Sequence, residues 1–238
     1  MRTDHRPLWL KRALTAYHRA WAKRFLVPQF DEVGDGLIVF GPEHVEVNGP
    51  RVRLGRDVHM MATRDNPIRF TVFAQPGGCV DVGDYSIVLP GVRISSASRI
   101  TIGKNCMFAT NCYVTDADWH DLYDRTSAPG GTAPVVLHDN VWIGDSAIVC
   151  KGVTIGENSV IGAGAVVTRN IPPNTVAAGN PARAVKPLDP EREIIRRESL
   201  FHKEVSYAQW IDNFETWLLT PNSLRRYLRS RFSPTRDS

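Results

Sequence analysis

Hydrophobic residues recur every six positions between Leu137 and Ile171. Each repeat begins with an aliphatic residue, at Leu137, Ile143, Val149, Ile155, Ile161 and Val167. A second set follows four positions after each of these, at Val141, Ala147, Val153, Ser159, Ala165 and Ile171. A period of six matches neither the turn of an α-helix nor the alternation of an ordinary strand. It is typical of a parallel β-helix.

In a parallel β-helix each six-residue repeat forms one flat side of a triangular coil, and coils rise by about 4.8 Å. Both repeat positions face the narrow interior. The same spacing extends upstream from Val114 to Val82, with a two-residue slip between Ile94 and Ile102. Before Cys79 the spacing is blurred. Ordinary strands of a sandwich are the alternative, and the run of repeats in phase favours the β-helix.

Both ends of the chain show helical spacing instead. Leu10, Leu14, Tyr17 and Trp21 recur at steps of three and four, and similar steps recur around Trp210. We therefore predict an all-β core, a parallel β-helix of hexapeptide repeats, with amphipathic α-helices at the N- and C-termini. The expected segments are a basic amphipathic helix over 1–30, irregular early coils over 31–79, the β-helix over 80–186 with a loop at 115–136, and a helical extension over 187–238.

The two ends are also strongly basic. Residues 1–25 contain seven Lys or Arg and one acid, and residues 223–238 contain five Arg and one acid. One interpretation is that the terminal helices cap the exposed ends of the coil. The other is attachment to the surface of an anionic membrane. Nucleic acid is not the expected partner, because no binding motif accompanies the charge.

The remaining composition indicates a cytoplasmic protein, at most peripheral at the inner face of the membrane. No segment approaches the roughly 20 apolar residues of a membrane span. The N-terminal residues are charged and lack the apolar run of a secretory signal. Among the four cysteines, Cys106 and Cys112 fall at inward positions and are interpreted as core residues, with a reactive thiol as the alternative.

The six-residue spacing is lost after Val114 and resumes at Leu137. Long loops on rigid scaffolds often carry function. His120 is the residue of this loop best suited to move a proton near neutral pH. Asp116 and Asp118 are candidates to orient its imidazole. A solvated surface histidine is the alternative.

Downstream of the loop, conspicuous motifs follow in a fixed order. They are Val141-Trp142-Ile143-Gly144, Gly152-Val153-Thr154-Ile155-Gly156, Ile161-Gly162-Ala163-Gly164, Val167-Thr168-Arg169 and Ala178-Gly179-Asn180-Pro181-Ala182-Arg183. Together with the loop, this order resembles the hexapeptide-repeat acyltransferases, which include galactoside, maltose, nodulation-factor and bacterial polysaccharide O-acetyltransferases. The resemblance implies a left-handed β-helix, a homotrimer with active sites between subunits, and acetyl-CoA as the acyl donor.

The resemblance also assigns roles to individual residues. His120 matches the general base, and Trp142 matches the tryptophan of the donor cleft. The remaining residues that match contacts to acetyl-CoA are Ala147, Ala165, Thr168, Arg169 and Arg183. Arginine suits the phosphates of the donor because of its fork of N–H donors. Without the resemblance, packing and solvated charge are the alternatives for these residues.

The acceptor is less well defined. Gly91 stands where the family's sugar acetyltransferases carry an asparagine, and their N-terminal module is missing. We expect transfer to a saccharide hydroxyl in polysaccharide biosynthesis, on a cell-envelope polysaccharide, a lipid-linked precursor or a glycolipid. The alternatives are transfer to an amine and a non-catalytic scaffold. A zinc enzyme is not expected, because His59, His120 and His138 lack the required spacing; His59 and His138 are interpreted as surface residues.

Overall fold

The computed structural model describes residues 4–75, 77–202 and 207–233. The chain divides into two compact units. The coil unit comprises Trp21–Arg197, and the terminal unit comprises Met1–Ala20 together with Glu198–Ser238. Both ends of the chain therefore belong to the same unit.

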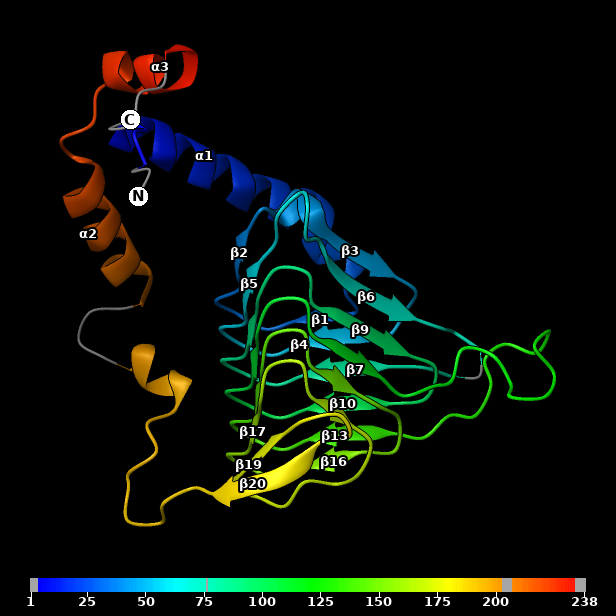
Figure 1. The fold of residues 1–238 in the computed structure, drawn as a ribbon. Helices are drawn as coiled ribbons and strands as arrows, with labels where there is room; N and C mark the ends of the chain where they lie inside the picture. Colours follow the sequence, from blue (N-terminus) through cyan, green and yellow to red (C-terminus); the bar gives the residue numbers. More distant parts are fainter. Residues whose placement is uncertain (1–3, 76, 203–206, 234–238) are drawn as a thin grey trace. The chain divides into compact units, whose positions relative to one another are not determined.

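Short strands of the coil unit form three sides of a left-handed parallel β-helix (Figure 1). Side A contains β1 (Glu32–Val33), β4 (Val52–Leu54), β7 (Val80–Val82), β10 (Ile100–Ile102), β13 (Val135–Leu137) and β16 (Thr154–Ile155). Side B contains β2 (Ile38–Phe40), β5 (His59–Met61), β8 (Ile87–Val88), β11 (Met107–Phe108), β14 (Trp142–Ile143), β17 (Val160–Ile161), β19 (Thr175–Ala178) and β20 (Arg183–Pro187). Side C contains β3 (Val45–Asn48), β6 (Ile68–Val72), β9 (Arg93–Ser96), β12 (Tyr113–Thr115), β15 (Ile148–Val149) and β18 (Val166–Val167).

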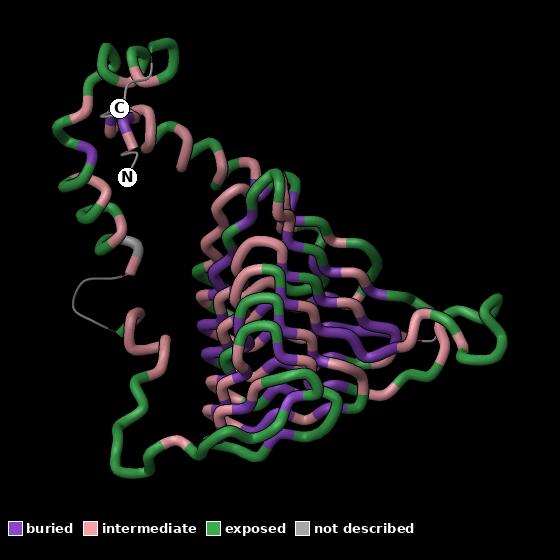
Figure 2. The backbone as a smooth tube through the Cα atoms, in the orientation of Figure 1, coloured by how far each residue is buried: buried purple, intermediate pink, exposed green. Residues whose placement is uncertain are grey.

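Equivalent residues of successive coils lie directly over one another. On side B, Phe108 pairs with Val88 of the preceding coil and with Ile143 of the next, which in turn pairs with Ile161. All four side chains are fully buried, and buried residues recur along the walls of the coils in Figure 2. The six-residue spacing exists because each inward side chain stacks on its counterpart one coil away. The predicted parallel β-helix is confirmed.

The parallel strand pairing begins earlier in the chain than the six-residue repeat that the sequence shows. β1 pairs with β4 and β4 with β7, all in parallel. Additional turns separate the early strands, including a 3₁₀ turn at Pro42–His44 and a turn in which the Thr63 and Asn66 backbones bond reciprocally at 3.3 and 3.2 Å. These additional turns lengthen the sides and shift the inward positions. The parallel pairing therefore extends back to Glu32, although the sequence there lacks a six-residue period.

The last coil ends with a reversal of the chain. Ile171 bridges to Ile155 on side A, and β19 continues side B in parallel with β17. β20 then runs antiparallel to β19. An antiparallel strand cannot feed another turn of the coil, so it ends the stack.

Two of the inward cysteines behave as core residues. Cys106 and Cys112 are fully buried. Burial raises the pKa of each thiol to about 12, so both stay protonated at neutral pH. A thiolate nucleophile is therefore not favoured at either position.

His59 does not lie at the surface as expected. His59 lies on the outer face of β5, but the residue is only 4% exposed. The rings of His59 and Phe40 have centroids 5.5 Å apart. Burial, with a smaller effect from the charge of Arg197, lowers the pKa of His59 to about 4. The sequence placed the side chain correctly outside the coil but contained no signal for the segments that cover it. His138 is exposed, as predicted.

The helices lie mainly in the terminal unit. They are α1 (Leu8–Trp21), α2 (Tyr207–Leu219) and α3 (Leu224–Phe232), with a π-helical turn at Ala22–Leu26 and 3₁₀ turns at Val27–Gln29 and Arg197–Leu200. Across the described part of the chain, none of the helices combines the length and the apolar character that a membrane crossing requires.

Candidate active site

The loop between β12 and β13 begins as a short two-stranded ribbon. Ala117 and Thr132 form an antiparallel bridge. The Asp118 amide donates to the Gly131 carbonyl at 2.9 Å, and the Asp118 carbonyl accepts from the Gly130 amide at 2.7 Å. The loop therefore leaves the coil on a hydrogen-bonded base, and Figure 1 shows it projecting from the stack.

Asp116 anchors this two-stranded ribbon to the preceding coil. Its side chain is fully buried. One carboxylate oxygen accepts from Ser96 Oγ at 2.6 Å and from the Ser98 amide at 2.9 Å, and the other accepts from the Ala97 amide at 2.7 Å. These three donors occupy the carboxylate, so Asp116 does not orient His120 as the sequence suggested.

Asp118 is also engaged elsewhere. Its carboxylate forms an ion pair with Lys151, in the turn between β15 and β16. This contact ties the loop to the following coil, whereas Asp116 ties it to the preceding one. The expectation that Asp118 orients His120 is therefore corrected as well.

His120 is exposed and is oriented by the backbone of its own loop. Its Nδ1 lies 3.1 Å from the carbonyl oxygen of Arg125. A carbonyl oxygen can only accept, so Nδ1 carries the proton in this bond. In the neutral imidazole Nε2 is then the basic nitrogen. The geometry thus selects the tautomer that a general base requires.

Two acids of the loop hold the turn that presents the Arg125 carbonyl. Asp124 accepts from Thr126 Oγ1 at 2.5 Å and from Ser127 Oγ at 2.7 Å, and these side-chain bonds lower the pKa of Asp124 to about 2. Asp121 accepts from the Asp124 amide at 3.0 Å, which lowers the pKa of Asp121. Both groups stay charged at neutral pH and keep the turn closed.

The residue before His120 is fixed by aromatic side chains of the coil. Trp119 Nε1 donates to Tyr113 Oη at 2.8 Å, and the Trp119 and Phe73 ring centroids lie 5.0 Å apart. The Arg93 guanidinium carbon lies 4.4 Å from the centroid of the Tyr113 ring. Because Trp119 is adjacent to His120, this cluster restrains the backbone that carries the imidazole.

We expect Tyr113→Phe to lower kcat by a few-fold for any reaction in which His120 transfers a proton, because it removes the hydroxyl that holds Trp119. The free energy of unfolding is expected to fall by about 0.5–1.5 kcal/mol, the usual contribution of one hydrogen bond. Steady-state kinetics and urea denaturation measure the two effects. Tyr17→Phe, which removes a hydroxyl from a side chain 58% exposed in α1, is the matched control. Equal kcat in the two variants would contradict the positioning role.

Trp142 lies on the outer face of side B. It stands in register between Met107 and Val160 of the neighbouring coils, and it is 46% exposed. A large indole that stays this accessible on a coil is available to a ligand or to another chain.

The turns between sides B and C have little side-chain bulk. Ala147 and Ala165 are fully buried at the ends of two such turns. Gly144 opens the first turn, and a Cβ there would lie 2.5 Å from the Ile161 carbonyl oxygen. Gly164, with φ of +66°, has no atom within 4 Å of a built Cβ and therefore borders open space. A slender ligand has access to the backbone along this edge.

The other predicted donor residues are exposed. Thr168 and Arg169 occupy the turn from side C back to side A. Arg183 begins β20, and its Nη1 donates to the Ala182 carbonyl at 2.8 Å. The predicted donor residues thus border side C along both of its edges.

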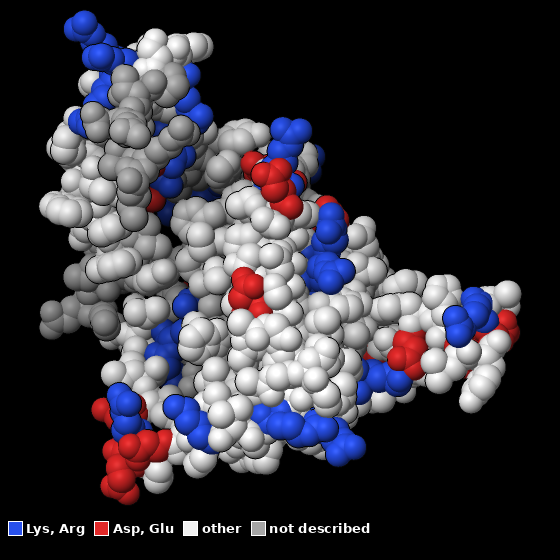
Figure 3. Space-filling model, in the orientation of Figure 1, with Lys and Arg blue, Asp and Glu red and all other residues white. Residues whose placement is uncertain are grey.

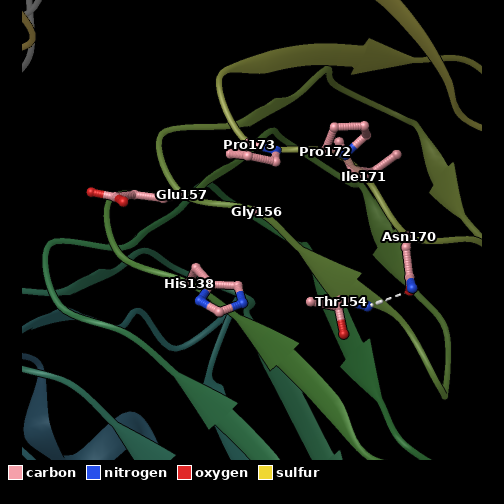
Figure 4. Close-up of a pocket in the computed structure, with 8 residues that line it drawn as sticks. All are labelled: His138, Thr154, Gly156, Glu157, Asn170, Ile171, Pro172 and Pro173. Atoms are coloured by element: carbon pink, nitrogen blue, oxygen red, sulfur yellow. Dashed lines mark hydrogen bonds between the residues drawn. The ribbon is translucent and has the colours of Figure 1, made fainter.

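A separate pocket of about 460 Å³ lies beside side A near the last coil (Figure 4). Glu157 at its rim is ion-paired with Arg196. None of the residues predicted for the active site lines it. The lining residues are His138, Thr154, Gly156, Glu157, Asn170, Ile171, Pro172 and Pro173.

Among residues 4–75, 77–202 and 207–233, no three His, Cys, Asp or Glu side chains gather into a group able to hold a metal ion. His59 is buried beside side B, whereas His120 is exposed on the loop.

Known proteins share the coil and its repeat. The family described as bacterial transferase hexapeptide (six repeats) matches residues 134–169. Galactoside O-acetyltransferase from Escherichia coli K12 is 41% identical over 120 residues, covering 50% of this chain and 59% of that protein. A maltose O-acetyltransferase from Clostridium difficile 630 is 32% identical, with 66% of this chain and 71% of that chain covered and a TM-score of 0.45. This chain belongs to the hexapeptide-repeat acyltransferase superfamily.

The hexapeptide-repeat fold is also shared with an acetyltransferase from Vibrio cholerae. That structure is 25% identical, covers 71% of this chain and 81% of its own, and has a TM-score of 0.51. The chain spans about half the length of the curated relatives it matches, with 45% and 59% of two of them covered. The residues that match the family, 134–169, lie within the coil unit.

Proposed function

We propose that this chain is an acetyl-CoA-dependent O-acetyltransferase that acts on a saccharide hydroxyl. The observation that carries the proposal is the bond from His120 Nδ1 to the Arg125 carbonyl, which leaves Nε2 as a base. The imidazole belongs to a loop that Asp116 and Asp118 hold to the adjacent coils. In the sequence this loop directly precedes the coils that contain the donor motifs. Named relatives that acetylate galactosides and maltose support the type of reaction.

His120 performs the proton transfers in this mechanism. Nε2 takes the proton of the acceptor hydroxyl as its oxygen attacks the thioester carbonyl carbon. The C–S bond then breaks, and the imidazolium returns the proton to the departing thiolate. The acetyl group passes directly to the acceptor oxygen, so no acyl-enzyme forms. Backbone N–H groups are suited to stabilise the negative charge on the carbonyl oxygen.

The residues of side C and its edges fit acetyl-CoA. The open backbone beside Gly164 admits a narrow pantetheine arm, with Ala147 and Ala165 in the adjoining turns. Arg169 and Arg183 are exposed, and the guanidinium of Arg169 and the N–H donors of Arg183 beyond the one bonded to Ala182 are suited to its phosphates. We propose Thr168 and Trp142 as the remaining contacts. The bound donor supplies the activated acetyl group.

We further propose that the site is completed in a homotrimer. The loop of His120 leaves the coil from side C, whereas Trp142 stands on side B. Residues on different faces of one coil are suited to a cleft shared between neighbouring copies. The proposed acceptor is a sugar of a cell-envelope polysaccharide, a lipid-linked precursor or a glycolipid. Gly91, with φ of +78°, replaces the acceptor-placing asparagine expected for small sugars.

Thiol release from acetyl-CoA tests this function across oligosaccharides, lipid-linked sugars and amino sugars. We expect acceptor-dependent release with hydroxyl acceptors, and Trp142→Ala is expected to raise KM for acetyl-CoA by about tenfold, the loss of about 1.4 kcal/mol of contact. Trp9→Ala, which changes a tryptophan 59% exposed in the terminal unit, is the control. Transfer only to amines would replace the proposed acceptor class. Donor binding without turnover on any acceptor would indicate a scaffold.

A further inference from the structure

The terminal unit uses its N-terminal basic residues internally. Lys11 and Arg12 of α1 form ion pairs with Glu215 and Asp212 of α2, each at 3.0 Å. Arg6 pairs with the neighbouring Asp4 at 2.6 Å. The first two contacts join α1 to α2, and the three pairs engage Arg6, Lys11 and Arg12 of the four Lys and Arg residues between positions 4 and 20. The N-terminal basic cluster is therefore not the main cationic surface of this unit.

The arginines of α3 are arranged differently. Arg225, Arg226, Arg229 and Arg231 are exposed, and none of them forms an ion pair with any residue that the structure describes. The guanidinium carbon of Arg231 lies 5.7 Å from the centroid of the Tyr227 ring. Figure 3 shows blue atoms gathered over the part of the terminal unit that carries α3. A concentrated positive charge thus faces solvent on one short helix.

The same helix exposes an apolar stripe. Leu224, Leu228 and Phe232 are 47%, 44% and 82% exposed. They recur at intervals of four, which places them along one face of α3. Ser223 caps the helix by accepting from the Arg226 amide at 3.3 Å. α3 is therefore a capped, cationic amphipathic helix with an exposed apolar face.

α2 adds a row of aromatic rings. Trp210, Phe214 and Trp217 are 55%, 48% and 74% exposed. Successive ring centroids lie 5.7 and 6.1 Å apart, so the rings form a continuous row. The Asn222 side chain donates to the carbonyls of Asp4 and Arg6 at 2.6 and 3.1 Å, which fixes the connection from α2 to α3. Exposed tryptophans of this kind favour the boundary between lipid headgroups and acyl chains.

We propose that α3, supported by the aromatic row of α2, docks the protein on an anionic lipid surface. Arginines bind lipid phosphates through paired N–H donors, while the leucines, Phe232 and the indoles enter the interfacial layer. Charge complementarity selects a membrane over an apolar protein partner, because the four arginines of α3 lack acidic partners among the described residues of the terminal unit. Docking would hold the enzyme where lipid-linked acceptors occur, but it does not depend on acetyl transfer.

Vesicle flotation of the full chain tests this surface. The protein is expected to float with phosphatidylcholine vesicles that contain phosphatidylglycerol, to remain unbound with phosphatidylcholine alone, and to dissociate as salt increases. Arg225→Gln combined with Arg229→Gln is expected to lower the partition coefficient at least about tenfold, since each basic residue near such a surface contributes about fivefold. Trp217→Ser is expected to weaken binding by a few-fold.

The matched control is Arg53→Gln combined with Arg69→Gln, which removes the same charge from exposed positions of the coil unit. Circular dichroism verifies that all variants fold. Equal flotation of the α3 variant and this control would overturn the proposal. So would the absence of flotation with phosphatidylglycerol, or binding of the wild-type protein to DNA or heparin without binding to vesicles. A concentration-dependent increase in mass that Trp217→Ser abolishes, without vesicle binding, would show instead that the surface joins copies of the chain.

Discussion

His120→Ala is expected to lower kcat for acetyl transfer by about 10²–10⁴-fold, the usual contribution of a general base. The carbonyl of Arg125 fixes the imidazole through Nδ1, so Nε2 is already in the tautomer that accepts a proton. Alanine removes this group and leaves the coil unchanged. KM for acetyl-CoA is expected to stay within about twofold, because the loss affects only the transition state.

Steady-state kinetics and calorimetric titration with coenzyme A separate these effects. His138→Ala is the matched control, since His138 is also exposed but stands at the end of β13 beside another pocket. Its kcat is expected to equal that of the wild type. If His120→Ala retained wild-type kcat with an acceptor that the wild type acetylates, a different group would have to serve as the base.

The coil was predictable because its packing is periodic. Each inward residue contacts its equivalents in the coils before and after it, as Ile143 does with Phe108 and Ile161. That requirement imposes the same residue type every six positions. The interruption after Val114 was equally visible, because a loop outside the stack is released from the constraint.

The details of the loop were not predictable for a related reason. Asp116 and Asp118 lie close to His120 in sequence, but hydrogen bonds to Ser96 and the ion pair with Lys151 draw both carboxylates toward the coil. The partner of the imidazole is instead a backbone carbonyl, which every residue possesses. No residue type at position 125 signals that role.

The terminal helices show the same limit. Their spacing indicated amphipathic helices, yet the ion pairs of Lys11 and Arg12 with α2 join residues about 200 positions apart. The number of charged residues alone therefore indicated the same excess of positive charge at both ends of the chain. The structure distinguishes them, because acids of α2 pair with Lys11 and Arg12 of α1, whereas the arginines of α3 are exposed.

Asp116→Ala is expected to lower the free energy of unfolding by about 3–5 kcal/mol, a large effect for one substitution. The carboxylate accepts from Ser96 Oγ and from the amides of Ala97 and Ser98 at 2.6–2.9 Å, in a fully buried site. Removing it leaves these donors without an acceptor, and each unsatisfied buried group costs about 1–3 kcal/mol. Urea denaturation measures the change.

Asp116→Asn provides the finer test of the same site. The amide keeps the shape of the side chain but replaces one acceptor oxygen with a donor NH₂. Because donors face both carboxylate oxygens, either orientation of the amide opposes one donor with another. We therefore expect a smaller loss of about 1–3 kcal/mol. Asp65→Asn, on an exposed side chain, is expected to change the unfolding free energy by less than about 0.5 kcal/mol. If Asp116→Ala were as stable as this control, the buried carboxylate would not anchor the loop. The ribbon that Asp116 anchors also carries the loop of His120. Hydrogen exchange at the Asp118 amide, which donates to the Gly131 carbonyl across the ribbon, is therefore also expected to accelerate in the Asp116 variants.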